Sequence, residues 1–256
     1  MDAVRPVQEV ELFHLLFLRA LETRLDRKAY VVKGGVNLRA WFGSARYSED
    51  LDLDAVAVEA HTLRDRVDQV LSSAVFQTLL RSQGLHVTRT SRPKQTETTQ
   101  RWKLEIAGRS GERALHTKIE FSRRDSAEPY VLEPARPEIV RAYGLPPPTA
   151  NHYTAAAAVR QKIGALVGRR EPQARDIWDL DHLFRTRADS DPRPLAPRLE
   201  QALAPALERV LDLPFAVFRS QVVPFLSSEH QEIFGTAESW DRMREGVVER
   251  LTELAP

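Results

Sequence analysis

Three aspartates alternate along one short stretch of the 256-residue chain, where Asp50, Asp52 and Asp54 stand in the run SEDLDLD. On a β-strand, side chains two positions apart point to the same face about 7 Å apart, so the carboxylates would share a face while Leu51 and Leu53 enter the core. A divalent cation relieves the repulsion among such charges. A merely acidic outer face is the alternative, but aspartate is a poor strand former. The pattern favours a Mg²⁺ or Mn²⁺ site.

A glycine turn comes about fifteen residues before the acidic stretch. Lys33, Gly34 and Gly35 follow an apolar run at 30–32 that predicts a strand, and they precede a short predicted helix at 36–42. Glycine lets the backbone approach a phosphate closely, and the free amides at a helix start attract its charge. An ordinary turn explains a lone Gly-Gly pair as well, so the nearby acidic strand is what favours phosphate binding here.

A further carboxylate should come from a neighbouring strand, and the segment HTKIEF at 116–121 supplies one. Ile119 and Phe121 would face the core, which places Lys118 and Glu120 together on the opposite face. Glu120 is therefore a candidate third metal ligand or a base for an attacking hydroxyl. A Lys–Glu pair on a solvated face is the alternative.

Lysine is rare in this chain, with six lysines among 37 basic residues, so a lysine suggests a need for a compact point charge. Lys162 is a candidate contact to a β- or γ-phosphate. Asp176 stands at a predicted helix start, where a carboxylate can also act as a cap, and Asp179 suits a salt bridge equally well. The arginines that could support Lys162 are Arg169, Arg170 and Arg175.

The remaining patterns predict an α/β (α+β) fold, with a mixed sheet flanked by helices and a mainly helical C-terminal domain. Three proline residues at 146–148 mark a plausible boundary, so we expect a catalytic domain at 1–147 and a helical domain at 148–256 that completes the active-site cleft. The predicted helices lie at 7–25, 62–80, 155–167, 176–185, 197–211 and 237–254, and the further predicted strands at 50–58, 85–90, 101–107 and 115–122.

Basic and acidic residues nearly cancel, at 37 against 36, so any contact with nucleic acid must be local. The chain has no cysteine, which leaves oxygen and imidazole as metal ligands. No secretory leader is evident, and no apolar stretch approaches the roughly 18 residues of a membrane span, so we expect a cytoplasmic protein.

A local excess of basic residues lies between Arg81 and Arg113, where eight Lys or Arg face three acids. Such a patch could hold an RNA backbone, and Trp102 within it could stack on a base. The alternative is an ordinary charged hairpin on the surface, with Trp102 in the core.

Together these motifs resemble the AbiEii/AbiGii toxins, a family of nucleotidyltransferases with the fold of the DNA polymerase β superfamily. Family sequences typically carry KGG, then R-x-S-x-D-x-D, then a K-x-E strand, then a Lys and an R-D-x-x-D-L helix. This chain has KGG at 33–35, RYSEDLD at 46–52, KIE at 118–120, and Lys162 followed by RDIWDL at 175–180. No family resemblance is evident in the last seventy residues.

The motifs and the resemblance together imply a set of site residues. They are the metal ligands Asp50, Asp52 and Glu120, the nucleotide contacts Lys33, Gly34, Gly35, Arg46, Ser48 and Lys162, and Asp176 as a further catalytic residue. Ser48 matches a serine that can be phosphorylated to silence toxins of the MenT-like branch, although a turn hydroxyl explains it as well. Asp54 departs from the family pattern, and it is either a third ligand or a bystander.

The MenT-like branch transfers nucleotides to the 3′ acceptor end of tRNA and blocks translation. We therefore expect a Mg²⁺-dependent nucleotidyltransferase of EC class 2.7.7 that uses a nucleoside triphosphate, takes RNA such as the tRNA 3′ end as acceptor, and has a cognate antitoxin encoded nearby. One alternative keeps the chemistry but changes the acceptor to a small molecule or a protein hydroxyl. The other is a catalytically silent module that binds a triphosphate and acts through partner binding.

Overall fold

The computed structural model describes residues 5–109, 114–123, 128–186 and 197–254. By its internal contacts the chain divides into two compact units. Unit 1 comprises Met1–Gly43 and Tyr47–Tyr153, and unit 2 comprises Ser44–Arg46 and Thr154–Pro256. The short segment Ser44–Arg46 therefore belongs to the second unit although its neighbours in sequence belong to the first.

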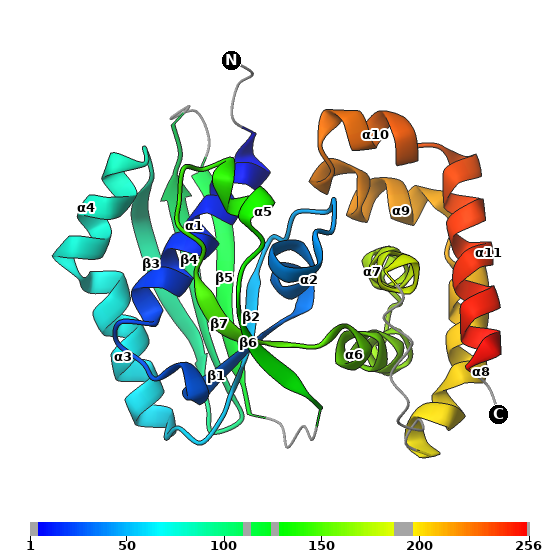
Figure 1. Cartoon of the computed structure of the whole chain (residues 1–256), viewed down its shortest axis with the longest axis horizontal. Coiled ribbons are helices and arrows are strands. Elements are labelled where there is room, and N and C mark those ends of the chain that lie inside the picture. Colours follow the sequence, from blue (N-terminus) through cyan, green and yellow to red (C-terminus); the bar gives the residue numbers. More distant parts are fainter. Residues whose placement is uncertain (1–4, 110–113, 124–127, 187–196, 255–256) are drawn as a thin grey trace. The chain divides into compact units, whose positions relative to one another are not determined.

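Unit 1 is built on a seven-stranded mixed sheet with the order β3-β4-β5-β2-β1-β7-β6 (Figure 1). The pairs β2–β5 and β1–β7 are parallel, and the other neighbours are antiparallel. The strands are β1 (Tyr30–Lys33), β2 (Leu51–Ala55), β3 (His86–Gln95), β4 (Thr99–Ala107), β5 (Ala114–Ser122), β6 (Tyr130–Pro134) and β7 (Thr149–Tyr153).

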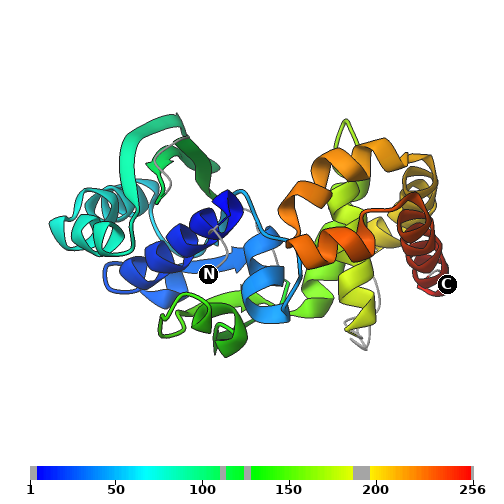
Figure 2. The ribbon, with the colours of Figure 1, turned by 90° about the horizontal axis from the view of Figure 1, so that it is seen from above.

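Alternation along the central strands decides which face of the sheet is covered. On β4, Trp102, Leu104 and Ile106 are buried while their neighbours are not, so one face packs against helices and the other carries polar side chains. Figure 2 shows the helix α1 (Pro6–Leu21) running along this sheet. Phe13 and Phe17 of α1 pack against Phe76. The other helical elements of unit 1 are η1 (Arg27–Ala29), α2 (Gly34–Phe42), α3 (Ala60–Ser72), α4 (Ala74–Ser82) and α5 (Pro137–Arg141).

Unit 2 is helical in its described part, and stacked aromatic rings form much of its core. Phe218 stacks on Trp240 with ring centroids 4.6 Å apart and on Trp178 at 6.2 Å. The elements are α6 (Ala155–Gly168), α7 (Ala174–Arg185), α8 (Pro197–Asp212), α9 (Phe215–Gln221), η2 (Val223–Phe225), α10 (Ser228–Phe234) and α11 (Ala237–Glu253).

The predicted fold class is confirmed, a mixed sheet with flanking helices followed by a helical region. The single helix predicted at 62–80 is two helices, because Ser73 is extended and accepts a hydrogen bond from the Phe76 amide to cap α4. The strands β6 and β7 were not predicted. Since Thr149–Tyr153 is a strand of the sheet, unit 1 runs past the boundary predicted at residue 147.

Candidate active site

A row of charged residues crosses the exposed face of the unit 1 sheet. In the strand register Lys33 lies opposite Asp52, Asp52 opposite Glu120, and Glu120 opposite Arg101. Directly paired residues on neighbouring strands project to the same face, so this row lies on the face away from the buried Leu51 and Leu53. The predicted alternation of acidic and core positions is therefore present on β2.

Lys118 lies among the three predicted metal ligands. Its Nζ is 3.2 Å from Asp50 Oδ2, 3.8 Å from Asp52 Oδ1 and 3.9 Å from Glu120 Oε2. All four side chains are partly open to solvent, between 22% for Glu120 and 35% for Asp52. The carboxylates thus face a common space, and that space attracts a cation.

The pKa of the Asp52 carboxyl is raised above its ordinary value. Burial of its carboxyl raises the pKa of Asp52, and repulsion from Asp50 and Glu120 adds to the rise against the opposing attraction of Lys118 and Lys33. The remaining negative charge favours an added cation at this position.

Gly34 brings the backbone of the glycine turn against Asp52. Its φ is +67°, and a Cβ placed there would lie 3.2 Å from Asp52 Oδ2. Glycine is needed at Gly34 for both reasons, since a side chain would strain the backbone and crowd the carboxylate. The helix α2 begins at Gly34, and its N-cap Lys33 makes no side-chain cap bond, so the first amides of α2 start beside Asp52.

Lys33 itself is bound to Asp54 rather than free for a phosphate. Its Nζ donates to Asp54 Oδ1 and to Ser122 Oγ, each at 2.5 Å. Asp54 is 4% exposed and also accepts from Ser122 and from the Tyr153 hydroxyl, at 2.7 Å each. Asp54 is therefore saturated with donors and anchors Lys33, which leaves the predicted phosphate contact of Lys33 dependent on release from these partners.

Glu120 forms an ion pair with Arg101, the residue opposite it on β4. A role as ligand or base requires Glu120 to share or leave this partner. The neighbouring Trp102 is completely buried and donates to Asp68 Oδ1 at 2.8 Å, so the idea that Trp102 stacks on a base is wrong and its core alternative holds. Of the basic patch around these strands, Arg113 lies outside the described residues.

A buried hydrogen-bond chain supports the backbone just before the aspartates, and the sequence motifs did not reveal it. Thr117 donates to the Glu49 carbonyl at 2.7 Å, and His14 Nε2 lies 2.7 Å from the same Thr117 hydroxyl. Since that hydroxyl gives its proton to Glu49, His14 must donate from Nε2. Burial lowers the pKa of His14 to about 3, which keeps the ring neutral. Ser48 Oγ donates to the Asp50 carbonyl at 2.8 Å, as its turn interpretation predicts.

The predicted residues of the helical region form a second cluster, within unit 2. Lys162 Nζ lies 2.9 Å from Asp176 Oδ1 and 2.6 Å from Asp179 Oδ2, and both aspartates are fully buried. Arg46 contacts both oxygens of Asp179 at 3.0 Å, and Arg169 pairs with Asp176 at 2.9 Å. Arg46, predicted beside the nucleotide, is thus packed in this network.

Electrostatics within the second cluster outweigh the cost of burial. Burial alone would raise the pKa of Asp179, but Arg46 and Lys162 lower it. Burial likewise disfavours the Lys162 ammonium, while attraction to Asp176 and Asp179 raises the pKa of Lys162. Asp179 and Lys162 therefore both stay charged near neutral pH.

The donor set of unit 1 suits a hard divalent cation held by two carboxylates. Within the described residues, no group of three or more His, Cys, Asp or Glu side chains is arranged to hold a metal by itself. Mg²⁺ in phosphoryl-transfer sites commonly takes only one or two protein carboxylates and completes its shell with substrate phosphates and water. Asp50 and Asp52 meet that requirement.

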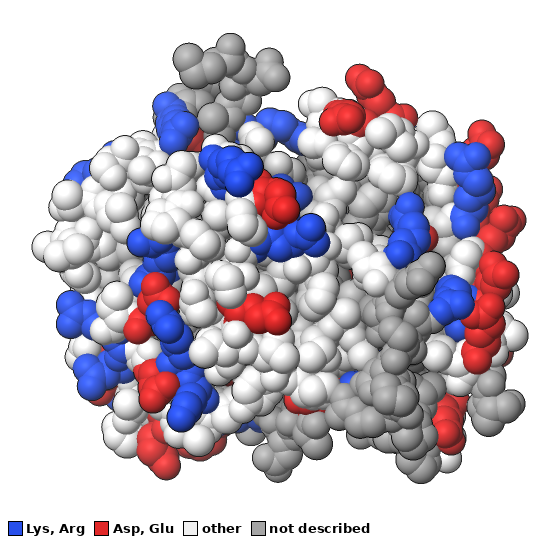
Figure 3. Space-filling model, viewed as in Figure 1, with Lys and Arg blue, Asp and Glu red and all other residues white. Residues whose placement is uncertain are grey.

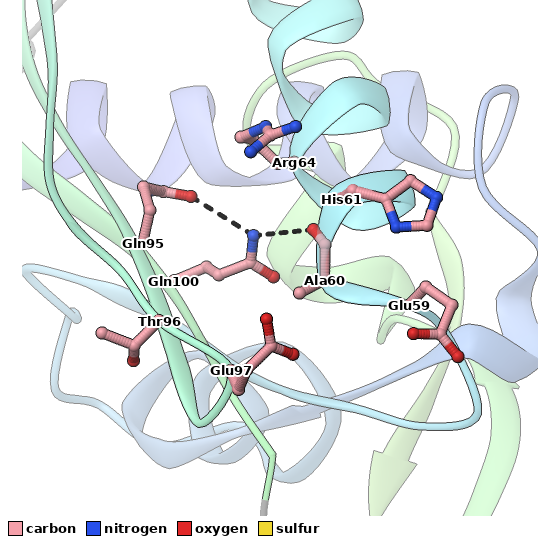
Figure 4. Close-up of a pocket in the computed structure, with 8 residues that line it drawn as sticks. All are labelled: Glu59, Ala60, His61, Arg64, Gln95, Thr96, Glu97 and Gln100. Atoms are coloured by element: carbon pink, nitrogen blue, oxygen red, sulfur yellow. Dashed lines mark hydrogen bonds between the residues drawn. The ribbon is translucent and has the colours of Figure 1, made fainter.

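A separate pocket of about 150 Å³ lies between the start of α3 and the turn that joins β3 to β4 (Figure 4). Gln100 closes it by donating to the Ala60 carbonyl at 2.9 Å and to Gln95 Oε1 at 3.2 Å. The lining residues are Glu59, Ala60, His61, Arg64, Gln95, Thr96, Glu97 and Gln100. None of the predicted site residues is among them, so this pocket is not the candidate site.

A mixed sheet with a glycine turn beside paired aspartates is suited to binding a nucleoside triphosphate together with a divalent cation. The family model described as "Nucleotidyl transferase AbiEii toxin, Type IV TA system" matches residues 16–253. The chain therefore belongs to the AbiEii nucleotidyltransferase toxin family, which confirms the resemblance found in the motifs. No curated protein matches the sequence.

Solved structures share this fold at low sequence identity. JHP933 from Helicobacter pylori is similar with a TM-score of 0.58 and 20% identity over 95% of this chain and 94% of that protein. MenT4, a nucleotidyltransferase toxin from Mycobacterium tuberculosis, is similar with a TM-score of 0.56 and 23% identity over 96% of this chain and 83% of that protein. Within the described part of this chain, no helix is both long and apolar enough to span a membrane.

Proposed function

We propose that this protein transfers a nucleotide from a nucleoside triphosphate to the 3′-hydroxyl of an RNA, with the acceptor end of tRNA as the target, and so inhibits translation in the cytoplasm. A cognate antitoxin would hold this activity in check, consistent with the type IV toxin–antitoxin system named for the family. The observation that carries the proposal is the position of the Asp52 carboxylate, which faces a common space with Asp50 and Glu120 and lies directly against the turn at Gly34.

Asp50 and Asp52 would hold one or two Mg²⁺ ions, with Glu120 as a further ligand if it is released from Arg101. Bound there, the ion would neutralise charge on the attacking and leaving oxygens of an in-line displacement at the α-phosphate. The amides at the start of α2 and the Gly34–Gly35 turn would receive the phosphates. Asp54 would hold the Lys33 ammonium next to this turn. Lys33 would then add positive charge near the phosphates while it stays bound to Asp54.

The remaining predicted roles are kept as proposals that single variants can test. Glu120 would take the proton of the attacking hydroxyl after it separates from Arg101. Lys162 would neutralise the departing pyrophosphate, with Asp176 and Asp179 orienting its ammonium. Arg46 would act through Asp179, and Ser48 would shape the turn at Asp50 as well as offering a hydroxyl for phosphorylation.

Basic side chains on the same face of the sheet favour an RNA acceptor over a small molecule. Lys94 lies opposite Arg101 in the register, and Lys103 lies opposite Lys118, so they continue the charged face from β5 onto β4 and β3. Lys94 and Lys103 are exposed. On the face shown in Figure 3, basic and acidic side chains are interspersed. A local basic surface beside carboxylates suits a polynucleotide backbone next to a metal.

The test is to incubate the purified protein with each labelled triphosphate, Mg²⁺ or Mn²⁺ and total RNA. The proposal expects one triphosphate to label RNA of tRNA size at its 3′ end. A double variant, Lys94→Glu with Lys103→Glu, should lose RNA labelling but keep triphosphate binding. Label in protein or in a small molecule would show that the acceptor is not RNA. Metal-dependent triphosphate binding without any transfer of label would favour the catalytically silent binding module.

A further inference from the structure

The ammonium group of Lys118 lies close to three carboxylates in unit 1. Lys118 Nζ is within 3.9 Å of an oxygen of Asp50, of Asp52 and of Glu120. The lysine side chain is 25% exposed and the two aspartates are 31% and 35% exposed, so the group is open to ions from solvent. Lys118 thus stands among the oxygens that a divalent cation would use.

Two other cations in the same row of the sheet, Lys33 and Arg101, have contacts of their own. Lys33 donates to Asp54 and Ser122, and Arg101 pairs with Glu120. Lys118 is the basic residue that the structure pairs with both Asp50 and Asp52. In the protein without metal, the repulsion between these aspartates is therefore relieved chiefly by Lys118.

We propose that Lys118 is a built-in counterion that competes with the divalent cation for Asp50 and Asp52. It holds the carboxylates together before the metal binds and withdraws from them when the metal arrives. This inference depends on the proposed metal site. A lysine is suited to the exchange because its charge is compact and its four-carbon stem has several rotatable bonds. Lys118 is a positioning residue in the metal-free protein rather than a metal ligand.

The competition couples metal binding to triphosphate binding. When metal alone displaces Lys118, the ammonium loses its partners and stays close to another positive charge. A bound triphosphate would supply the displaced ammonium with a new negative partner, so each ligand would favour the other. The protein would then hold metal weakly until a triphosphate is present.

The test uses Mn²⁺ as the probe and follows its binding to the full chain by titration calorimetry and electron paramagnetic resonance. Lys118→Met keeps the apolar stem and removes the charge, and it should bind Mn²⁺ about ten-fold more tightly than the wild type without nucleotide. Lys118→Arg should restore weak binding because it restores the charge. Lys28→Met is the matched control, since it removes one exposed lysine from η1, outside the proposed metal and RNA surfaces, and it should bind Mn²⁺ like the wild type.

Two further measurements separate competition from a merely structural role. Without metal, Lys118→Met should unfold at a lower temperature than the wild type. Saturating Mg²⁺ should raise the unfolding temperature of Lys118→Met by more than it raises that of the wild type. A non-hydrolysable triphosphate should tighten Mn²⁺ binding less in Lys118→Met than in the wild type.

If Lys118→Met binds Mn²⁺ no more tightly than the wild type, while Asp52→Asn abolishes binding, the counterion role is overturned and the metal site stands. If the wild type and Asp52→Asn bind Mn²⁺ equally, the proposed metal site fails and the counterion role fails with it.

Discussion

The two units each gather acidic and basic side chains, but with opposite balance and exposure. In unit 1, three carboxylates, those of Asp50, Asp52 and Glu120, share two cations in a partly open space. In unit 2, two fully buried aspartates are surrounded by three cations, those of Lys162, Arg46 and Arg169. The same residue types therefore make one cluster that lacks positive charge and one that is saturated with it.

This difference separates a partly open cluster that can accept an added cation from a buried cluster whose charges are already paired. A carboxylate such as Asp52, with a raised pKa and an oxygen beside an open turn, gains from an added cation. A carboxylate such as Asp179, bound by two charged donors and closed to solvent, has little to gain. The four predictions below test this contrast, in order of decreasing expected effect.

The largest expected effect is on catalysis, from Asp52→Asn. Removing one metal-binding charge should lower nucleotide transfer by about 10³-fold or more, which corresponds to about 4 kcal/mol of transition-state stabilisation. The unfolding temperature should stay equal or rise, because the substitution also removes repulsion against Asp50 and Glu120. A single-turnover assay and a thermal melt check both parts. Retained transfer would contradict the assignment of Asp52.

In unit 2 the corresponding change should act on stability. Asp179→Ala leaves Arg46 and Lys162 buried with less negative charge and should cost about 3–5 kcal/mol in the free energy of unfolding, measured with urea. Because the pKa of Asp179 is lowered, the wild-type contribution should be lost only as the pH falls below about 4.

The control is Glu238→Gln, which breaks an exposed pair with Arg242 in the same unit and should cost less than about 1 kcal/mol. Equal losses for Asp179→Ala and Glu238→Gln would remove the contrast between a buried network and an ordinary surface pair.

The support of the acidic site should show a pH dependence of its own through His14. Its pKa is about 3 in the folded protein and about 6.5 when unfolded, so below pH 6.5 the unfolded chain binds a proton that the folded chain does not. Wild-type stability should therefore fall between pH 6.5 and 3. At pH 4.5 the loss of stability should be about 2–3 kcal/mol smaller in His14→Gln than in the wild type. Parallel pH profiles for the two proteins would contradict the prediction.

The smallest expected effect comes from Ser48→Ala, which removes the hydrogen bond to the Asp50 carbonyl. The free energy of unfolding should fall by about 0.5–1.5 kcal/mol, with a modest decrease in transfer because the turn still forms. Chemical denaturation and the transfer assay measure the two changes. Loss of activity as large as that of Asp52→Asn would indicate a direct role of Ser48 at the nucleotide.

Local patterns explain how much could be predicted from the chain. Most of the elements could be identified from the period-two alternation on β2, β4 and β5 and from the apolar spacing of the long helices. In each case the spacing of the apolar residues reflects which face of the element is buried. The exposed edge strand β6 has no such signal, because its residues from Tyr130 to Pro134 are all exposed. The break at Ser73 was missed since a serine is compatible with a helix until its cap bond is known.

By itself, the sequence determined the family, the fold class and the identity of the acidic strand and glycine turn, because these depend on residue types at short, regular spacing. Only the tertiary structure decided which charged groups are partners. It pairs Lys33 with Asp54, Arg101 with Glu120 and Lys118 with Asp50. It also reveals the contact of His14 with Thr117 beside the acidic strand. The reason is physical, since an ion pair or a buried hydrogen bond depends on distance in space between strands and helices that are far apart in the chain.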